Sequence, residues 1–467
     1  MIKFGTGGFR GVIGDDFTKQ NVQLVAQALC NIIRADNSNL PVVVGFDHRF
    51  CSDRFAQWFG ETLAGNNVRV LLYAEPMPTP AVMTAVRDEK LDYGVMITAS
   101  HNPYYFNGVK LFVSGGMDAD VEFTNRLEAE CQQAANVAEM PLSAAQNAGL
   151  ITAYSNKRQY LDNIKAFVSP KIKRNNANVL YDNLWGVGAG CIAPLMKEVG
   201  IKNFTVLHTQ HDAFFNFEMP NPTEANMLPL RSVVLSEKYD FAFGTDSDSD
   251  RLGILDEKGN YVSSNEILAA LYYYLVKYRG MKGDVVKNCA TSILVDKVAK
   301  KLGYKCHEVD VGFKNISAEI KRTDALIGGE SSGGLTVRGY IFGKDSVFSS
   351  ILFTEMVIVM QKPVSQIMQE LRQFADYNYV CVEDQISFDS EEGLVEYLTD
   401  NMPQFNQPVA TFQHFNRNFK YIFEDGSWAL IRLSGTEPVF RVFAEFQTAK
   451  EAHTNIEILR KFIASKK

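Results

Sequence analysis

A short polar loop follows a run of apolar residues near position 100. In the segment VMITASHNPYYFNGVKL (95–111), Ser100 and His101 are adjacent, and Lys110 follows after a stretch of turn-forming residues. A strand over 93–97 would place Ser100 at the carboxyl edge of a sheet, where open α/β sheets bind ligands. A serine hydroxyl becomes an effective nucleophile only beside a base or a metal ion. Taken alone, the loop is better explained as a surface turn built from Ser, Asn and Pro.

Three aspartates alternate directly after a second predicted strand. Asp246, Asp248 and Asp250 lie in DFAFGTDSDSDRLGILD (240–256), and carboxylates this close repel one another unless a cation holds them together. The spacing is similar to an EF-hand loop, but Arg251 stands where that loop needs glycine. A solvated acidic turn is the alternative, although a run that leaves a strand directly is held in place. The sequence therefore predicts a divalent-cation site, which Mg²⁺ would complete with water or a phosphate oxygen.

Two later loops carry residue types that bind sugars and phosphates. In IGGESSGGLTV (327–337), glycines let the backbone approach a ligand, and Glu330 can accept hydrogen bonds from hydroxyl groups. That segment alone could be an ordinary glycine turn. In IRLSGTEPVFR (431–441), Arg432 and Arg441 flank a Ser-Gly-Thr run. This arrangement suits a phosphate dianion, although a simple hairpin would look the same.

Predicted strands and helices alternate along most of the chain. Apolar, β-branched segments at 41–46 and 68–73 predict buried strands, and a helical pattern lies between them at 55–63. Such alternation is typical of parallel α/β sheets. The C-terminal part differs, because strand patterns dominate there before a helix expected over 449–463. The predicted fold class is α/β, with three tandem similar α/β domains and a C-terminal α+β domain.

A repeated unit supports the tandem arrangement. Three segments each resemble a helix, then a glycine, then a β-branched strand, with the glycine at Gly65, Gly200 or Gly303. Glycine suits the left-handed residue that ends many helices, although this unit is common to all α/β proteins. The expected domains are 1–140 with the Ser100 loop, 155–256 with the aspartates, 257–370 with the glycine-rich loop, and 376–467 with the arginine pair.

Composition limits the classes of function. At 467 residues the chain is too long for one hydrophobic core, and its formal net charge of -7 argues against a nucleic-acid partner. The seven cysteines include no C-x-x-C pair, which indicates reduced thiols in the cytoplasm. The N-terminus has no apolar signal segment, and no apolar run reaches membrane-spanning length. A cytoplasmic enzyme without a membrane partner is expected, and its oligomeric state is not predicted.

Together the four loops resemble one known family. A nucleophilic serine, a metal site, a hydroxyl-binding loop and a phosphate cradle occur in chain order, as phosphoryl transfer on a sugar phosphate requires. TASHNP with NGVK, DSDSDR, GESSGG and RLSGTEP resemble the motifs of the α-D-phosphohexomutase family, the phosphoglucomutase and phosphomannomutase enzymes. The resemblance covers essentially the whole chain and includes FGTGGFRG, GFDHR (45–49) and VGFK (311–314). Ser247 and Ser249 depart mildly from the usual metal loop. The resemblance implies mixed sheets and four domains around a central active-site cleft.

The family's roles map onto this sequence residue by residue. Ser100 would carry a phosphoryl group, and Mg²⁺ would bind that group together with Asp246, Asp248 and Asp250. Arg10 and Arg251 would neutralise the transferring phosphoryl group. Either His101 or Lys110 would act as the general acid and base, and the sequence does not choose between them. The implied substrate-binding residues are Lys314, Gly329, Glu330, Ser332, Arg432, Ser434, Gly435, Thr436 and Arg441.

The resemblance implies a reaction but leaves the sugar open. A hexose 1-phosphate and a hexose 6-phosphate would interconvert through a bisphosphorylated sugar such as glucose 1,6-bisphosphate. Glucosamine-phosphate relatives usually carry glutamine where this chain has Ser331, and the bacterial glucose/mannose enzymes usually end the loop with histidine or asparagine where it has Gly334. Glucose phosphate is the first expectation, and mannose phosphate is also expected. A phosphoglucosamine mutase and a serine- and metal-dependent sugar phosphatase are the alternatives.

Overall fold

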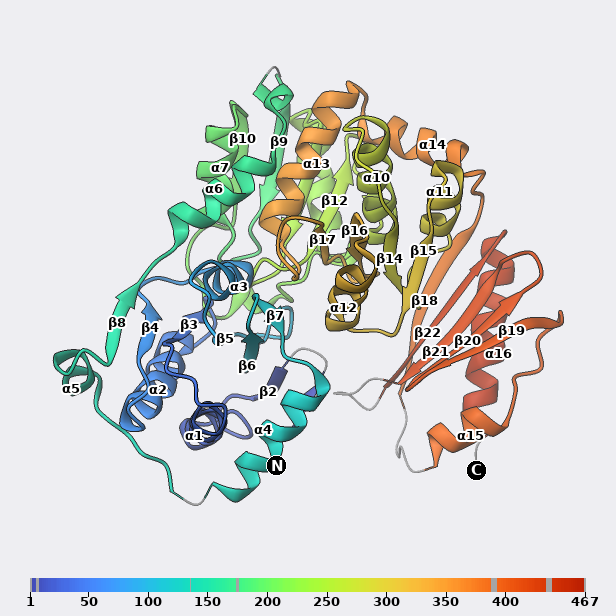
Figure 1. The fold of residues 1–467 in the computed structure, drawn as a ribbon. Helices are drawn as coiled ribbons and strands as arrows, with labels where there is room; N and C mark the ends of the chain where they lie inside the picture. Colours follow the sequence, from blue (N-terminus) through green and yellow to red (C-terminus); the bar gives the residue numbers. More distant parts are fainter. Residues whose placement is uncertain are drawn as a thin grey trace.

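Four groups of strands build the molecule (Figure 1). The computed structural model describes residues 2–5, 8–134, 136–173, 176–387, 393–433 and 439–465. The first unit holds an eight-stranded sheet of order β1-β2-β6-β5-β3-β4-β8, with β7 beside β6. Its strands are β1 (Phe4–Gly5), β2 (Gly8–Val12), β3 (Val42–Phe46), β4 (Val70–Tyr73), β5 (Tyr93–Ile97), β6 (Phe106–Val113), β7 (Met117–Asp118) and β8 (Ile151–Tyr154). Its helices are α1 (Lys19–Ala35), α2 (Ser52–Gly65), α3 (Thr79–Asp88), α4 (Val121–Gln133) and α5 (Leu142–Asn147).

The second and third units repeat the pattern on smaller sheets of order β10-β9-β11-β12-β13 and β15-β14-β16-β17. Strands of the second are β9 (Asn178–Asp182), β10 (Asn203–Leu207), β11 (Phe241–Thr245), β12 (Leu252–Asp256) and β13 (Tyr261–Val262). Helices near it are α6 (Lys157–Phe167), α7 (Ala189–Glu198), α8 (Glu224–Met227) and α9 (Arg231–Ser236). Strands of the third are β14 (Val285–Asn288), β15 (Cys306–Val309), β16 (Ile327–Gly329) and β17 (Leu335–Val337). Its helices are α10 (Ser264–Lys277), α11 (Leu294–Leu302), α12 (Phe313–Thr323), α13 (Ser346–Met360) and α14 (Val364–Ala375).

The C-terminal unit has a different architecture. Its five strands are wholly antiparallel in the order β18-β22-β21-β20-β19, and α16 packs against β18 and β22. The strands are β18 (Val380–Ser387), β19 (Val409–Phe415), β20 (Asn418–Phe423), β21 (Trp428–Leu433) and β22 (Val439–Phe446). The helices are α15 (Leu394–Asp400) and α16 (Ala449–Ala464). The predicted fold class, three α/β units and an α+β unit, is confirmed.

Each of the first three sheets is mixed in the same way. In each sheet, a set of parallel strands is followed by a strand that pairs antiparallel with the last of them. The antiparallel pair is β5–β6 in the first sheet, β11–β12 in the second and β16–β17 in the third. The three loops that join these pairs are the Ser100 loop, the aspartate loop and the glycine-rich loop. The loop between antiparallel β21 and β22 carries the Ser-Gly-Thr run. The chain therefore presents one candidate loop from each sheet.

Local predictions were mostly correct, with one instructive exception. The predicted strands at 41–46 and 93–97 are β3 and β5, which are buried along their whole length. Gly303 is the left-handed cap of α11 (φ 82°), and Gly200 also has positive φ (97°). Gly65 is instead the last residue of α2, where a Cβ would lie 2.7 Å from the Glu139 backbone nitrogen. Glycine is needed there for close packing and not for a left-handed turn.

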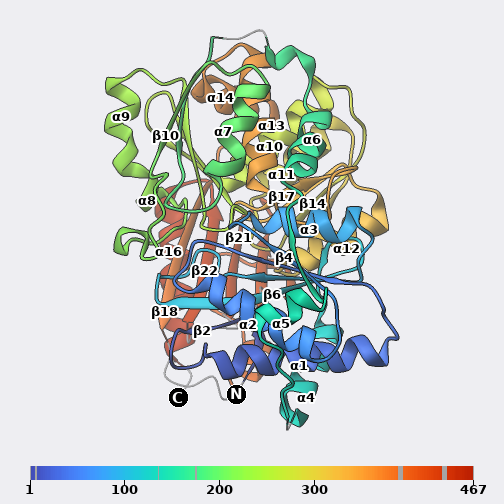
Figure 2. The ribbon, with the colours of Figure 1, turned by 90° about the vertical axis from the view of Figure 1, so that its left-hand side faces the viewer.

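The apolar core has two main parts. One continuous cluster of buried side chains runs through the first three units, and a separate cluster fills the C-terminal unit. Figure 2 shows the first unit below the second and third. Within the described ranges no single helix is both long and apolar enough to cross a membrane; α13 and α14, bent by 84° relative to each other, meet that test only as a pair.

Candidate active site

The first three loops and two strand residues of the C-terminal unit line one cavity of about 170 Å³. All four units contribute to its wall, and in the first three units the loop that joins an antiparallel strand pair supplies part of it. The predicted site residues that line the cavity are Arg10, His101, Lys110, Asp250, Arg251, Glu330, Ser332, Arg432 and Arg441. The cavity shares Arg251, Ser331, Ser332 and Arg441 with a second, larger cavity of about 570 Å³.

Ser100 is held in an unusual backbone conformation beside the aspartates. It is fully buried, and its φ of 53° lies in the left-handed region that is costly for a residue with a side chain. Its Oγ donates to Asp246 Oδ2 at 2.8 Å, and Nδ1 of His101 lies 3.5 Å from the same Oγ. Its backbone N–H donates to Thr98 Oγ1 at 2.9 Å. The strand-to-loop turn thus aims the hydroxyl at the aspartate loop.

A buried arginine fixes the shape of the Ser100 loop. Arg49 is 2% exposed, and its guanidinium donates to four backbone carbonyls of this loop. Burial lowers the pKa of Arg49, which neighbouring Asp47 partly offsets. Asp47 in turn accepts from Ser52 Oγ (2.8 Å) and Thr98 Oγ1 (2.6 Å). The sequence flagged GFDHR only as a family segment, and nothing local in it reveals that Arg49 reaches the loop fifty residues later. The four carbonyls belong to Ser100, Asn102, Pro103 and Phe106.

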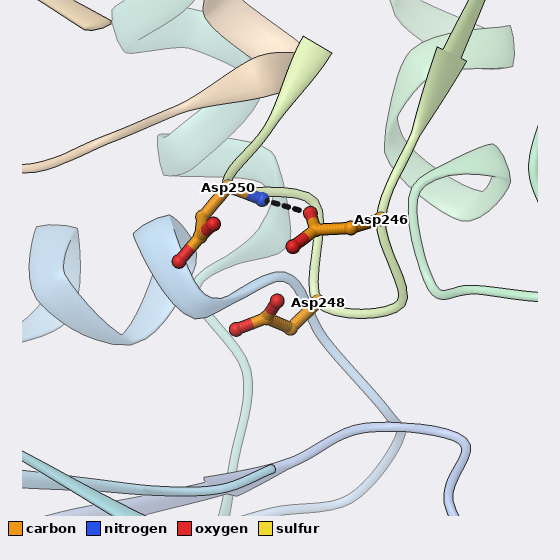
Figure 3. A group of neighbouring side chains, drawn as sticks. All are labelled: Asp246, Asp248 and Asp250. Atoms are coloured by element: carbon orange, nitrogen blue, oxygen red, sulfur yellow. Dashed lines mark hydrogen bonds between the residues drawn. The ribbon is translucent and has the colours of Figure 1, made fainter. Parts of the chain in front are cut away.

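The three aspartates face one another between β11 and β12 (Figure 3). One oxygen from each lies within 4.8 Å of the others, and all three residues are at least 98% buried. The Asp250 N–H donates to Asp246 Oδ1 at 2.9 Å, which closes the loop on itself. Thr79, the first residue of α3, donates its hydroxyl to Asp248 Oδ2 at 2.5 Å. Ser247, which departs from the usual family loop, links the two loops: its Oγ donates to the Ser100 carbonyl at 2.6 Å.

These side chains fit a divalent cation. Oδ1 of Asp248 and Oδ1 of Asp250 are buried, yet neither has a hydrogen-bond donor among the described residues. Burial, followed by the charges of Asp250 and Asp248, raises the pKa of Asp246 well above its usual range. Lys110 Nζ contacts Asp248 (2.6 Å) and Asp250 (2.7 Å) and offsets only part of this negative charge. A hard, all-oxygen set with unused acceptors is what Mg²⁺ requires.

Cationic groups surround the aspartates. Arg10 Nη1 donates to Asn102 Oδ1 at 2.7 Å, and burial followed by the charge of Arg251 lowers the pKa of Arg10 to about 10. Burial alone would lower the pKa of Lys110, but Asp248 and Asp250 outweigh it and hold the pKa above the usual range. Burial, then the Arg251 and Arg10 charges, lowers the pKa of His101 well below its usual range.

Lys344 is a cavity-lining residue that the sequence prediction missed. Its Nζ lies 3.3 Å from Asp250 Oδ2. Its side chain runs past Gly334, where an added Cβ would lie 2.1 Å from Lys344 Cδ. The glycine that ends GESSGG therefore leaves room for this lysine. Gly334 was the one sequence feature that pointed to a close neighbour at this position, but the sequence alone does not reveal which side chain lies there.

The glycine-rich loop presents Glu330 to the cavity. Glu330 is 7% exposed, and its Oε1 accepts from the Gly312 N–H at 3.0 Å. Ser332 Oγ lies 3.5 Å from Glu330 Oε2. Two other residues predicted to bind substrate do not line the cavity. Gly329 packs in β16, where a Cβ would lie 2.9 Å from Leu268 Cδ1, and Lys314 is half-buried at the start of α12.

Arg432 and Arg441 lie opposite each other on β21 and β22. Burial and then the charge of Arg441 lower the pKa of Arg432. Arg441 Nη1 lies 3.4 Å from Glu383 Oε1. Ser434, Gly435 and Thr436, predicted to cradle phosphate between these strands, lie outside the described residues. Two guanidiniums on one wall of the cavity have the charge and the donors that suit an anion.

A buried serine that faces buried carboxylates, beside a cationic cavity lined by four units, is the arrangement of a phosphoryl-transfer enzyme. The four domains of the phosphoglucomutase/phosphomannomutase family match residues 1–138 (domain I, alpha/beta/alpha), 158–259 (domain II, alpha/beta/alpha), 263–374 (domain III, alpha/beta/alpha) and 390–460 (the C-terminal domain). The chain belongs to this family, within the α-D-phosphohexomutase superfamily. Enzymes of the family are magnesium-dependent isomerases of carbohydrate metabolism that use a sugar bisphosphate intermediate.

Individual relatives differ in their sugars. The chain is 26% identical to a phosphoglucomutase/phosphomannomutase of Thermococcus kodakarensis, over 97% of each chain. It is 28% identical to a phosphoglucosamine mutase of Nitratiruptor, over 99% of each. A Thermus thermophilus structure described as a phosphomannomutase aligns with a TM-score of 0.86 at 26% identity, over 99% of both chains. An N-acetylphosphoglucosamine mutase of Aspergillus fumigatus, crystallised with GlcNAc-6P and magnesium, shares the fold at 14% identity (TM-score 0.58), over 99% of this chain and 95% of that one.

Proposed function

We propose that this protein interconverts hexose 1-phosphates and hexose 6-phosphates, with glucose preferred and mannose also accepted. The reaction runs through a phosphoserine at Ser100 and a bisphosphorylated sugar. The observation that carries the proposal is the 2.8 Å hydrogen bond from Ser100 Oγ to Asp246, within an aspartate triad that still has unused buried oxygens. When bound by these aspartates, Mg²⁺ supplies charge stabilisation to the phosphoryl oxygens.

The chain's own residues carry the transfer. The phosphoryl group leaves Ser100 Oγ as a bond forms to the free hydroxyl of the sugar phosphate; that hydroxyl gives up its proton, and the freed Ser100 Oγ takes one up. We assign proton acceptance to His101, because its ring lies 3.5 Å from Ser100 Oγ and lines the cavity. Lys110 is instead engaged by two carboxylates at 2.6 and 2.7 Å. Arg10, Arg251 and Lys344 neutralise the charge that gathers on the transferring group.

The distal end of the substrate needs a separate grip. Arg432 and Arg441 face the cavity from the C-terminal unit and bind the phosphate that is not reacting. Glu330 and Ser332 accept and donate hydrogen bonds to sugar hydroxyls common to both orientations. The bisphosphorylated sugar must turn end for end between its two transfers. The adjoining 570 Å³ cavity offers room for this movement next to the 170 Å³ reacting space.

A phosphoglucosamine mutase is the second candidate, since several relatives at 27–28% identity carry that name. A coupled assay with glucose, mannose and glucosamine 1-phosphates, plus a trace of the matching bisphosphate, decides between these sugars. Fastest turnover of glucosamine 1-phosphate would contradict the glucose assignment. Release of inorganic phosphate without a hexose 6-phosphate product would identify a sugar phosphatase instead.

Ser100→Ala tests the nucleophile directly. The variant should lose turnover while keeping its fold, because it removes only the hydroxyl that carries phosphate. Intact-mass measurement of the wild type should detect a species heavier by one phosphate, and this species should be absent in the variant. Retained mutase activity in Ser100→Ala would refute the assignment.

A further inference from the structure

A buried carboxylate fastens the C-terminal sheet to the third unit. Glu445 lies in β22 and is 0% exposed. It accepts hydrogen bonds from Ser292 Oγ (2.5 Å), the Ile293 backbone N–H (3.0 Å), Tyr377 OH (2.6 Å) and Trp428 Nε1 (2.5 Å). Only Trp428 belongs to the same sheet. Three of these four donors therefore come from outside it.

Two of the outside donors stand at the beginning of α11. Ser292 and Ile293 directly precede this helix, and the Leu294 N–H also donates to Ser292 Oγ at 3.0 Å. A helix N-terminus favours a negative charge, which Glu445 supplies. An apolar cluster seals the contact, with Cys289 and Ala290 on the third unit and Trp428, Leu430 and Phe443 on the sheet. Displacing the sheet would leave the carboxylate and its donors without partners, at a cost in free energy.

Glu445 and the cleft arginines lie on one face of one hairpin. Across β21 and β22, Glu445 pairs with Trp428, and Arg441 pairs with Arg432. Side chains alternate along a strand, so Arg441 and Glu445, four residues apart, share a face. At about 3.4 Å per residue they stand roughly 14 Å apart along β22. One end of this face is fixed to α11, and the other end lines the substrate cavity.

We propose that Glu445 is a positioning residue, which sets where Arg432 and Arg441 stand in the substrate cavity by fixing β21 and β22 to the start of α11. This inference rests on the proposed function, in which the two arginines bind the non-reacting phosphate. Loss of the anchor removes no group from the cavity. It lets the arginine pair move relative to Ser100, so the grip on the distal phosphate weakens in both orientations of the sugar.

The test compares Glu445→Gln with a matched control, Glu355→Gln. Glu355 in α13 is equally buried and accepts from Tyr274 OH (2.5 Å) and the Ser169 N–H (2.7 Å), but none of these residues belongs to β21 or β22. Glu445→Gln places an amide donor against existing donors. It should raise KM for hexose 1-phosphate and hexose 6-phosphate about tenfold with a smaller change in kcat, as expected for one weakened charge-assisted contact. Glu355→Gln should lower the melting temperature similarly and keep the wild-type KM.

The outcomes are separable. Wild-type KM in Glu445→Gln, or the same KM rise in both variants, would overturn the proposal. If Glu445→Gln does not fold, Ser292→Ala removes one donor and should raise KM in the same direction by less; an unchanged KM there would overturn the proposal equally. If the wild type shows no mutase turnover, the proposed function fails. Calorimetric affinity for glucose 1-phosphate then tests the anchor by itself, and equal affinity in wild type and Glu445→Gln would refute it.

Discussion

At the scale of single residues, Arg49 holds the loop of Ser100, the proposed nucleophile, through backbone carbonyls alone. A left-handed backbone at a residue such as Ser100 costs about 1–3 kcal/mol and persists only when the surroundings enforce it. The planar guanidinium of Arg49 supplies several donors in fixed directions, and they meet four carbonyls of the loop. The serine hydroxyl is thereby aimed before any substrate arrives.

Arg49→Lys should lower kcat with little change in KM. Lysine keeps the positive charge but cannot reach four carbonyls, and each buried acceptor left unsatisfied costs about 1–3 kcal/mol. The loop should relax and Ser100 should accept phosphate more slowly, which steady-state kinetics and intact-mass measurement of phosphoserine will detect. Arg54→Lys, at an exposed arginine of α2 bonded to Gln57, is the control and should behave as wild type. Unaltered kcat in Arg49→Lys would show that the clamp has no catalytic importance.

Asp248→Asn tests the cation site. The amide keeps the size of the side chain but removes one negative charge from the triad, so affinity for Mg²⁺ should fall. kcat should fall at low Mg²⁺, excess Mg²⁺ should restore part of it, and EDTA should inactivate the wild type. Mg²⁺ titrations of activity provide the measurement. If neither EDTA nor the substitution changes the activity, the aspartates have a purely structural role.

At the scale of elements, α13 begins at a carboxyl group whose pKa is raised, that of Asp345. Asp345 caps this helix by accepting from the Phe348 N–H at 2.9 Å, and Tyr160 and Tyr340 donate to it from two other segments. Burial is the main reason that its pKa rises to about 7. The folded protein therefore keeps a proton on Asp345 over a range in which the unfolded chain has lost it.

Asp345→Asn should reduce the pH dependence of stability. Between the usual aspartate pKa of 3.8 and the folded value of about 7, the folded state binds more protons than the unfolded state. Stability from this group is present at low pH and is lost as pH rises through about 7. Asparagine can still cap the helix but does not titrate. Thermal unfolding at pH 5 and pH 8 should show a smaller fall for the variant; parallel curves would contradict the shifted pKa.

The elements themselves were largely readable from local pattern. Continuous apolar runs identified β3 and β5, because strands covered on both faces cannot alternate with polar residues. The expected C-terminal helix is α16. β8 was missed, since only two of its four residues are even partly buried and it joins the edge of the first sheet. An edge strand of that length carries too little pattern to be recognised.

At the scale of the whole molecule, the site could be predicted only in part. The loops were found because each concentrates its chemistry in a few adjacent residues, and the roles given to them stay predictions. Their long-range partners were not found. Thr79 meets Asp248 across 169 residues, and Lys344 reaches the cavity only because Gly334 has no side chain. Contacts of this kind depend on how domains pack, which local spacing does not encode.

Arg432→Ala tests whether the C-terminal unit belongs to the site. Loss of one charge-assisted contact to phosphate costs about 1.5–3 kcal/mol, or roughly tenfold to a hundredfold in kcat/KM. The loss should be similar for the hexose 1-phosphate and the hexose 6-phosphate, since one grip serves both orientations. Mg²⁺ dependence should be unchanged. Arg460→Ala, which breaks an ion pair with Asp384 in the same unit, is the control. Full activity in Arg432→Ala would remove this unit from the proposed mechanism.

The division of the apolar core affects how the chain matures as it is synthesised. The first three units share one continuous cluster, so they must consolidate together, whereas the C-terminal sheet has its own cluster and can form afterwards. Every group proposed for phosphoryl transfer is translated before residue 375, but the two arginines of the distal grip arrive last, with α16 still to follow. The serine and the aspartates can thus come together on the ribosome, whereas the proposed distal phosphate site is complete only after β22 has emerged.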